Sequence, residues 1–529
     1  MSTTTTQRRW ILAIVVVLLG QFAYRAEISQ QQKSPVWDET IHMDYGSAFL
    51  RYGPKINPKD HPYPFDAFLA LPLVLGERPE LDARGNLLIS SPQNLWPVRR
   101  MNIVLATLGL LLMSYWVMRL FGGTVALLFL GMGTLDPGWI AQARFATTDI
   151  AHGLGFALTA LLLYHFRKEG GKRALVAAGA ASALAILSKF SGLLLFPLSL
   201  LLLLGSISIE HSWKQRLKEF GLYCASSVAF VLLVFQAHWL FGDAAFLDGF
   251  KHLAQGFDHF LEIRGLHKGI FFMGEYVQGG SLLYFPGLLL SKTPIVLLIL
   301  LGASLALPSV RRLIGANKWL FLIPLAFTAT AIVSRINSGL RHMTPLLPFL
   351  WLLGAWVLVA FKERVRDKQF LFPAFAVLLF LEVFLVHPHY LPFTNALYGG
   401  NEQAHTIASN AASDWGQDLG ALGAYLQANP PEEAIHLAYF GRTPPQRYGI
   451  KHVCRPCGAL GRPCHPKQAR DTCDADATIL AISATCLHGD ARRLDGKPGQ
   501  DTCYSWLKGR APDALIGGSI LLFKKPPPK

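Results

Sequence analysis

The sequence predicts a polytopic α-helical membrane protein that ends in a small soluble α/β domain. Of its 529 residues, 52% are hydrophobic and only 16% are charged, whereas a soluble protein carries about 25% charged residues. The apolar residues form long runs, such as Ile11–Gly20, Ser191–Ser206 and Leu346–Phe361, and roughly 20 apolar residues let a helix cross a bilayer. From Asn401 onward the chain turns polar and holds six of the seven cysteines.

Eleven transmembrane helices are expected, with ends that hydropathy places to within several residues. Basic residues in the short loops between them fall on one side, which is the cytoplasmic side by the positive-inside rule. Arg99 and Arg100 break this pattern, but they lie in a long loop, where the rule is weak. The expected spans are Trp10–Ile28, Met101–Leu120, Thr124–Leu135, Ile150–Phe166, Ala174–Leu187, Phe190–Ile207, Gly221–Phe241, Leu282–Leu307, Trp319–Val333, Met343–Phe361 and Phe370–Val386.

An odd number of spans places two long loops, about 29–100 and 242–281, on the outer face of a bacterial inner membrane. We therefore expect a transmembrane domain over residues 1–400 and a periplasmic or extracytoplasmic domain over 401–529, with strands at Ile435–Phe440, Ala477–Ile482 and Ser519–Phe523. The formal net charge of +15 is explained by orientation and anionic lipid. No nucleic-acid motif accompanies it, so nucleic acid is not an expected partner.

The cysteines of the C-terminal domain allow two interpretations. An even number in a polar, external domain favours disulfides in an oxidising compartment. The alternative is a zinc site, because Cys454-x-x-Cys457 has ligand spacing and His465 is near. The predicted topology favours disulfides. The six residues are Cys454, Cys457, Cys464, Cys473, Cys486 and Cys503.

Two adjacent carboxylates, Asp38 and Glu39, begin a probable helix in the first outside loop. Its stripe of Ile41, Tyr45, Phe49 and Tyr52 has helical spacing and suits either the membrane interface or packing against other loops. Asp38 suits a helix cap. This role does not exclude that of a general base, because a helix N-terminus favours the ionised carboxylate that a base requires. One turn on, His42 suggests a metal, but one His and one Asp are a thin ligand set, and no metal ligand is assigned.

A second acid and several cations are expected at the same membrane face. Asp149 begins the fourth span and is a further helix-cap candidate. Ionisable groups at membrane depth are functional candidates by default, although Lys189 and Lys292 also suit snorkelling to the interface. Arg341 starts the tenth span beside His342 and can bind a phosphate through two hydrogen bonds.

These groups fit the transfer of a sugar from a polyprenyl phosphate. A departing phosphate needs positive charge rather than a general acid, and the acceptor hydroxyl needs a base as it attacks the anomeric carbon. Hydrolysis by paired carboxylates would instead need a protonated acid for an alkoxide leaving group. One carboxylate and a cationic pocket are therefore sufficient.

Seven short motifs in chain order resemble the GT-C superfamily of polyprenyl-phosphate-sugar glycosyltransferases. The resemblance, over about Trp10 to Leu419, is to protein O-mannosyltransferase-like family 39 enzymes and the related aminoarabinose transferases. Tyr63 departs from the family's His-Pro-Pro stretch. The motifs are Asp38-Glu39, Asp60-His61-Pro62-Tyr63-Pro64, Arg144 to Asp149, Lys189-Phe190-Ser191-Gly192, Asn337-Ser338-Gly339-Leu340-Arg341-His342 with Pro345 and Pro348, His387-Pro388-His389-Tyr390-Leu391 with Gly399-Gly400, and Asp414-Trp415-Gly416-Gln417-Asp418-Leu419.

The resemblance implies a GT-C fold and an inverting hexosyl- or pentosyltransferase. Its base would be Asp38, supported by Glu39 and Asp149. The implied partners are a polyprenyl-phosphate sugar, a protein, lipid or glycan acceptor, and membrane lipid; the resemblance leaves a divalent metal open. Trp415 suits either stacking on a sugar or a core role. The substrate-binding candidates are His42, His61, Arg144, Lys189, Arg264, Lys292, Arg341 and His342.

The alternative function is a lipid transporter or flippase. Such proteins place polar groups near the middle of the bilayer, often in broken and repeated helices. In this sequence the polar residues gather at the outer ends of the spans, and no internal repeat is found. The sequence therefore favours the glycosyltransferase.

Overall fold

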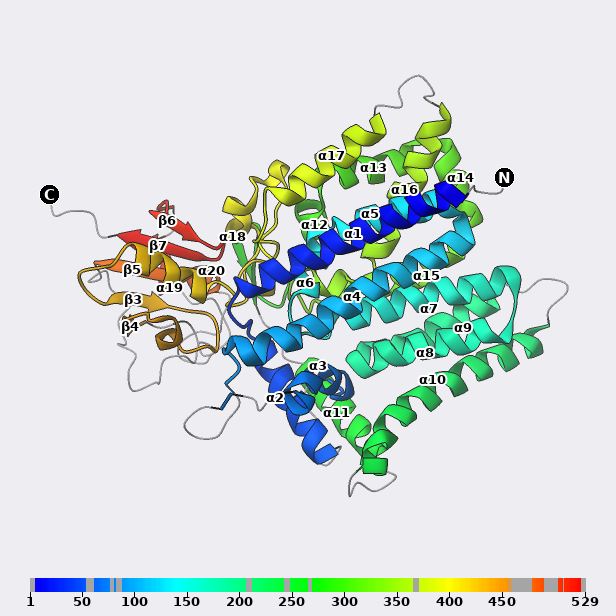
Figure 1. The fold of residues 1–529 in the computed structure, drawn as a ribbon, viewed down its shortest axis with the longest axis horizontal. Helices are drawn as coiled ribbons and strands as arrows, with labels where there is room; N and C mark the ends of the chain where they lie inside the picture. Colours follow the sequence, from blue (N-terminus) through cyan, green and yellow to red (C-terminus); the bar gives the residue numbers. More distant parts are fainter. Residues whose placement is uncertain are drawn as a thin grey trace.

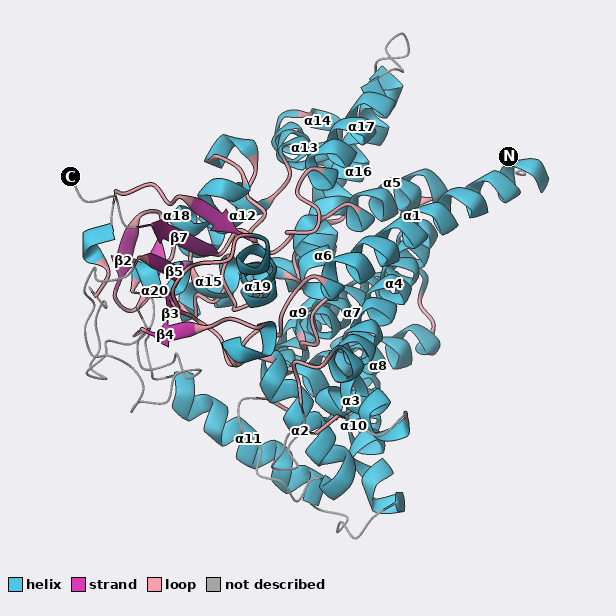
Figure 2. Ribbon diagram, turned by 60° about the vertical axis from the view of Figure 1, so that its left-hand side comes forward, coloured by secondary structure: helices cyan, strands magenta, loops and turns pink. Residues whose placement is uncertain are grey.

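Long helices form a bundle in the computed structural model, and a small mixed sheet lies at one end of it (Figure 1). The N-terminal end of α1 lies at the opposite end of the bundle from this sheet, as both Figure 1 and Figure 2 show. The structure describes residues 5–53, 61–76, 80–81, 88–205, 212–241, 248–264, 269–364, 371–455, 457, 478–489, 503–507 and 509–524.

Helices account for most of the described part of the chain. Those of the bundle and its loops are α1 (Thr5–Gln31), α2 (Glu39–Tyr52), α3 (Pro64–Leu75), α4 (Pro92–Phe121), α5 (Gly123–Thr134), α6 (Pro137–Ala143), α7 (Asp149–Glu169), α8 (Lys172–Ser188), η2 (Phe190–Leu194), α9 (Leu195–Leu204), α10 (Trp213–Phe241), α11 (Asp248–Arg264), α12 (Tyr284–Lys292), α13 (Ile295–Ala306), α14 (Pro308–Ala316), η3 (Lys318–Phe321), α15 (Leu322–Ser334), η4 (Leu340–Met343), α16 (Leu347–Arg364) and α17 (Leu371–Phe384). Of the later ones, α18 (Ala404–Ile407), α19 (Leu419–Ala428) and α20 (Ala484–His488) are short.

The bundle has the lengths and surface of a membrane protein. Within the described ranges, four unbroken helices are long and apolar enough to span a bilayer, in α1, α4, α7 and α10, and up to seven spans result if each of three bent helix pairs counts as one. Large apolar side chains point outward on α1 and α4, for example Val17 and Leu108, which suits lipid better than water. The apolar window of α7 is wholly buried inside the protein. The predicted class, a polytopic α-helical membrane protein, is confirmed.

Each of the eleven predicted spans falls on a helix or a helix pair, but Leu282–Leu307 is wrong as a single rod. Its two helices, α12 and α13, meet at 116°. Pro294 lies at the break, where it lacks an N–H and disfavours a helical conformation at the residue before it. The Asn395 side chain donates to the freed carbonyls of Leu290 (2.7 Å) and Thr293 (2.9 Å). A helix break at membrane depth is tolerated when the freed backbone carbonyls accept hydrogen bonds from other parts of the protein.

The loop over residues 29–100 forms the predicted helix α2, and α3 packs directly against it (Figure 1). Part of the expected stripe is used for packing: Phe49 is 2% exposed, and the ring of Tyr45 stacks on Tyr63 at 4.7 Å, whereas Tyr52 is 63% exposed. Gly46 sits at the contact, where a Cβ atom would overlap the carbonyl of Asp66. The missing side chain therefore sets how closely the two helices approach.

The polar C-terminal region contains the predicted small domain with a β-sheet. In the described part of this region, five strands form one sheet in the order β4–β3–β5–β7–β6. The parallel part joins β3 (Ile435–Ala438) to β4 (His452–Cys454) and β5 (Ile479–Ser483), whereas β7 (Ile520–Lys524) runs antiparallel to β5 and to β6 (Ala514–Ile516). The three predicted strands are confirmed. The two that the sequence missed, β4 and β6, have three residues each, too few for a period-two pattern to be recognised.

The disulfide interpretation of the cysteines holds where the structure describes them. Cys457 is bonded to Cys486, and Cys454 and Cys503 are also disulfide-bonded. The zinc alternative, which needed thiolates at Cys454 and Cys457, is therefore wrong. Cys464, His465 and Cys473 lie outside the described residues.

Replacing Gly46 by alanine is expected to separate α2 from α3 and to lower stability by about 1–3 kcal/mol, the usual cost of overpacking a tight contact. The measurement is thermal unfolding of the protein in detergent. Gly131→Ala in α5 is the matched control, because its Cβ atom would meet nothing within 4 Å. Equal melting temperatures for both variants would contradict the proposed role of this contact.

Candidate active site

Asp38 precedes α2 and faces across the fold to Arg341. It occupies the N-cap position, but its side chain makes no capping hydrogen bond, so the capping interpretation is wrong. Instead Oδ2 accepts a hydrogen bond from Arg341 Nη1 at 2.5 Å. The Asp38 side chain is 21% exposed and that of Arg341 is 14% exposed. The pair is thus enclosed but reachable from outside the protein.

Arg341 is held in place by a turn and by an aromatic ring. It belongs to η4, where Nε donates to the carbonyl of Ser338 and Nη2 donates to the Ser338 hydroxyl, both at 3.0 Å. Its guanidinium lies 4.4 Å from the ring centre of Trp415, an arrangement that favours the cation. Trp415 is 1% exposed. Its ring therefore packs against the arginine in the core and is not available to stack on a sugar.

A second ion pair, Asp149 with Lys189, lies close to the pair of Asp38 and Arg341, and the four residues form one charged cluster. Asp149 is the first residue of α7, while Thr148 holds the N-cap position, so Asp149 is not the cap either. Its carboxylate forms an ion pair with Lys189. Arg341 interacts electrostatically with Asp149 as well as with Asp38, and His342 interacts with Lys189, Arg341 and Asp149.

Neighbouring charges and burial shift the pKa values of three residues in the cluster, Asp38, Arg341 and His342, which lie outside the long helices of the bundle. Burial tends to raise the pKa of Asp38, but Arg341, His42 and His61 outweigh this effect, so the pKa lies below its usual value. Burial tends to lower the pKa of Arg341, but the two carboxylates raise it overall. Burial, Lys189 and Arg341 together lower the pKa of His342 well below its usual value. Near neutral pH, Asp38 is an anion, Arg341 a cation and His342 neutral.

Glu39, predicted to support Asp38, is fully engaged in contacts within the protein. Its side chain is fully buried and forms a two-pronged ion pair with Arg99, with both N–O distances at 2.7 Å. Its oxygens also accept the backbone N–H groups of Val36 and Ala146. With its acceptors occupied in this way, Glu39 is a positioning residue that ties the Asp38 loop to α4 and to the segment before Asp149.

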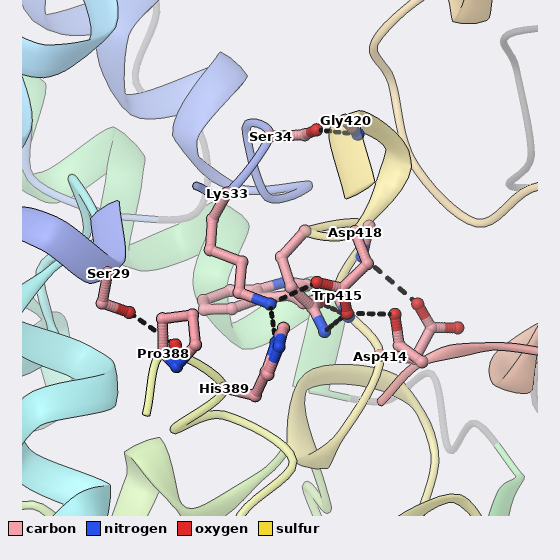
Figure 3. A network of polar contacts seen from close by, with 12 residues as sticks. Ser29, Lys33, Ser34, Pro388, His389, Asp414, Trp415, Asp418 and Gly420 are labelled. Carbon is pink, nitrogen blue, oxygen red and sulfur yellow. Dashed lines mark hydrogen bonds and ion pairs between the residues drawn. The ribbon is translucent and has the colours of Figure 1, made fainter. Parts of the chain in front are cut away.

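A network of buried polar contacts anchors the chain just before Asp38 (Figure 3). Lys33 forms an ion pair with Asp418 and contacts Nδ1 of His389 at 2.6 Å. Asp418 also accepts a hydrogen bond from Ser519 at 2.7 Å, and Ser34 accepts one from the Gly420 backbone at 2.7 Å. The C-terminal region thereby contacts the loop that carries Asp38.

Several predicted binding residues lie apart from the Asp38–Arg341 cluster or point elsewhere. Arg144 is fully buried and donates to Ser29 and to the carbonyl of Pro388, so it belongs with the anchoring network. Lys292 donates to the backbone carbonyls of Leu391 (3.1 Å) and Phe393 (2.9 Å). These contacts place both cations outside the Asp38–Arg341 cluster, and their binding of a phosphate stays a prediction. Arg264 ends α11, and its side chain lies outside what the structure describes.

His42 and His61 do join the cluster. Their rings stack at 4.9 Å, and both interact electrostatically with Asp38. His42 also hydrogen-bonds through Nδ1 to Asp66, at 2.9 Å. The structure thus brings together seven of the predicted residues: Asp38, Asp149, His42, His61, Lys189, Arg341 and His342.

The sequence assigned no role in the site to four residues that hold it, namely Lys33, Arg99, Asp418 and Asp66. Arg99 did leave a signal, since it broke the charge pattern of the loops. It is fully buried within α4, so it is an internal ion-pair partner and not a topogenic charge. A buried charge needs a partner, and the unexplained arginine next to a long loop could have suggested one.

The chain is similar to known proteins in part of its sequence and in its whole fold. Residues 84–241 match the family of dolichyl-phosphate-mannose-protein mannosyltransferases. A search of curated proteins found no match. Among solved structures, ArnT from Cupriavidus metallidurans in the apo state matches with a TM-score of 0.53 and 14% identity, over 98% of each chain. The same protein bound to undecaprenyl phosphate matches with a TM-score of 0.52 and 12% identity, over 97% of each chain.

The coverage shows that the likeness includes the C-terminal sheet as well as the helix bundle. The chain therefore has the fold of ArnT. Together with the family match over residues 84–241, this confirms the resemblance to GT-C superfamily glycosyltransferases that the motifs indicated.

Replacing Arg99 by methionine is expected to lower the free energy of unfolding by about 3–5 kcal/mol, because Glu39 keeps a buried charge without its partner. Arg100→Met is the matched control. Arg100 pairs with Glu27 at the surface, where its side chain is 51% exposed, and such pairs contribute about 0.2–1 kcal/mol. Thermal unfolding measures both. A similar small loss in the two variants would contradict the positioning role of Glu39.

Proposed function

We propose that the protein transfers a sugar, with inversion, from a polyprenyl-phosphate carrier to a hydroxyl group of a protein, lipid or glycan acceptor. The observation that carries the proposal is the cluster in which Arg341 interacts with both Asp38 and Asp149 while Lys189 pairs with Asp149. It joins a carboxylate base to two cations at one end of the helix bundle.

Asp38 suits the role of general base. Its pKa lies below the usual value, so it is ionised and able to take the proton of an acceptor hydroxyl as that oxygen attacks the anomeric carbon. The carboxylate is partly exposed, whereas Glu39 is sealed in the core. Of the two adjacent acids, only Asp38 is reachable by an acceptor.

Arg341, Lys189 and neutral His342 suit the phosphate end of the donor. As the bond between the sugar and phosphate breaks, negative charge builds on the phosphate oxygens, and fixed cations stabilise it. Arg341 is rigidly held by Ser338 and Trp415, so little reorganisation is needed during reaction. The fold match to ArnT bound to undecaprenyl phosphate supports a lipid phosphate as the donor class.

We place the cluster and the C-terminal domain on the outer face of a bacterial inner membrane. The basic loops predict this orientation, and the disulfide between Cys457 and Cys486 suits an oxidising compartment. Alkaline phosphatase fused after residue 529 should be active, because that enzyme needs external disulfides. A fusion at the N-terminal end should be inactive, and the reverse pattern would overturn the orientation.

Replacing Asp38 by asparagine is expected to reduce sugar transfer by more than about 100-fold, since the amide cannot accept the proton. Purified variants would be assayed for turnover of a radiolabelled lipid-phosphate sugar. Asp44→Asn, on the exposed face of α2, is the control and should retain transfer. Wild-type turnover by the Asp38 variant would end its role as base. Lipid movement across vesicles without any turnover would favour a flippase.

Replacing Arg341 by glutamine is expected to move the acidic limb of the pH–rate profile upward. In the wild type, Arg341 helps to hold the pKa of Asp38 below its ordinary value of 3.8. Without that cation the burial effect gains weight and the pKa rises, so the base becomes protonated, and transfer is lost, at a higher pH. The residual kcat/KM is measured from pH 4 to 8. An unshifted limb would mean that Arg341 acts only on the donor.

A further inference from the structure

Beside Asp38, three residues from two helices and a loop converge. His42 lies one turn into α2, His61 precedes α3, and Asp66 lies in the first turn of α3. One ligand atom from each residue lies within 4.8 Å of the other two. His42 and Asp66 are buried, whereas His61 is partly exposed, so the group opens on one side only.

The carboxylate of Asp66 points to a missing partner. Its side chain is fully buried, and Oδ1 contacts Nδ1 of His42 at 2.9 Å. Within the described part of the chain, Oδ2 is buried and has no hydrogen-bond donor. A buried carboxylate oxygen without a donor is costly, and a cation bound at this oxygen would remove that cost.

The packing around the three residues brings them close. The absence of a side chain at Gly46 lets the backbone of α2 approach the carbonyl of Asp66, one turn beyond His42. The ring of His61 stacks on that of His42, while the next turn of α2 is held to the same loop by the stacked rings of Tyr45 and Tyr63. The cluster is therefore positioned by two independent contacts between α2 and the α3 segment.

We propose that His42, His61 and Asp66 bind one divalent transition-metal ion, with Zn²⁺ the best match. Two imidazoles and one carboxylate form a set of three protein ligands that Zn²⁺ accepts while keeping a further position open. Mg²⁺ and Ca²⁺ prefer sets made of oxygen atoms. If the chain transfers sugar as proposed above, the ion adds positive charge next to Asp38, at the same cluster as Arg341 and Lys189.

The same contacts allow a simpler arrangement, in which Asp66 only orients His42 through a hydrogen bond. The two arrangements differ in metal content, which can be measured without a sugar donor. The full-length protein, purified in detergent, is stripped with a chelator, incubated with Zn²⁺ and desalted. Bound metal is then counted by mass spectrometry, and the experiment is repeated with Mg²⁺.

The wild type is expected to retain about one more equivalent of Zn²⁺ than His61→Gln or Asp66→Asn, and no such difference is expected with Mg²⁺. His405→Gln, in α18, and Asp44→Asn, on α2, are matched controls that should keep the ion. Because His61 is partly exposed, its variant should fold, and Zn²⁺ should raise the melting temperature of the wild type but not of this variant.

Equal Zn²⁺ content in the wild type and in His61→Gln would overturn the proposal and leave the hydrogen-bond arrangement. This result is independent of the proposed reaction, which the Asp38→Asn assay tests separately. A protein that binds Zn²⁺ at these residues and yet transfers no sugar would retain the metal site and lose only the proposed function.

Discussion

The ion pair between Asp38 and Arg341 is the contact on which the proposed chemistry depends. It joins residues 303 positions apart in the chain, one at the start of α2 and the other in η4. Each partner changes the ionisation of the other in the useful direction, because Arg341 keeps the carboxylate ionised and Asp38 keeps the guanidinium charged. Without this pairing, burial would raise the pKa of Asp38, and the site would lose one of its fixed cations for a phosphate.

The pair can form because other buried charges hold the Asp38 loop from both sides. Lys33 and Asp418 anchor the chain before Asp38, and Glu39 and Arg99 anchor it immediately after. Buried ion pairs contribute little net stability, because desolvation offsets much of their attraction. Their directional hydrogen bonds do specify one geometry. In this protein they set the position of a neighbouring carboxylate that remains partly exposed.

The C-terminal region is a structural part of the site. Trp415 lies against Arg341, and the backbone around Trp415 and Gln417 accepts hydrogen bonds from Trp37 and Ser34. Asp418 receives Lys33 as well as Ser519 of the sheet domain. The positions of Arg341 and of the loop that carries Asp38 therefore both depend on segments that follow the last helix of the bundle. This dependence explains why motifs as far along as Asp414–Leu419 accompany those of the first loop.

The sequence alone determined the class of fold, because apolar runs of spanning length and the polar, cysteine-bearing end follow directly from composition and periodicity. It also indicated Asp38, Asp149, Lys189 and Arg341 as candidate site residues, since charges at helix ends stand out against apolar surroundings. Only the tertiary structure decided which charges meet. Glu39 is indistinguishable from Asp38 in sequence, yet it is fully paired in the core, because pairing depends on contacts between distant segments that local patterns do not encode.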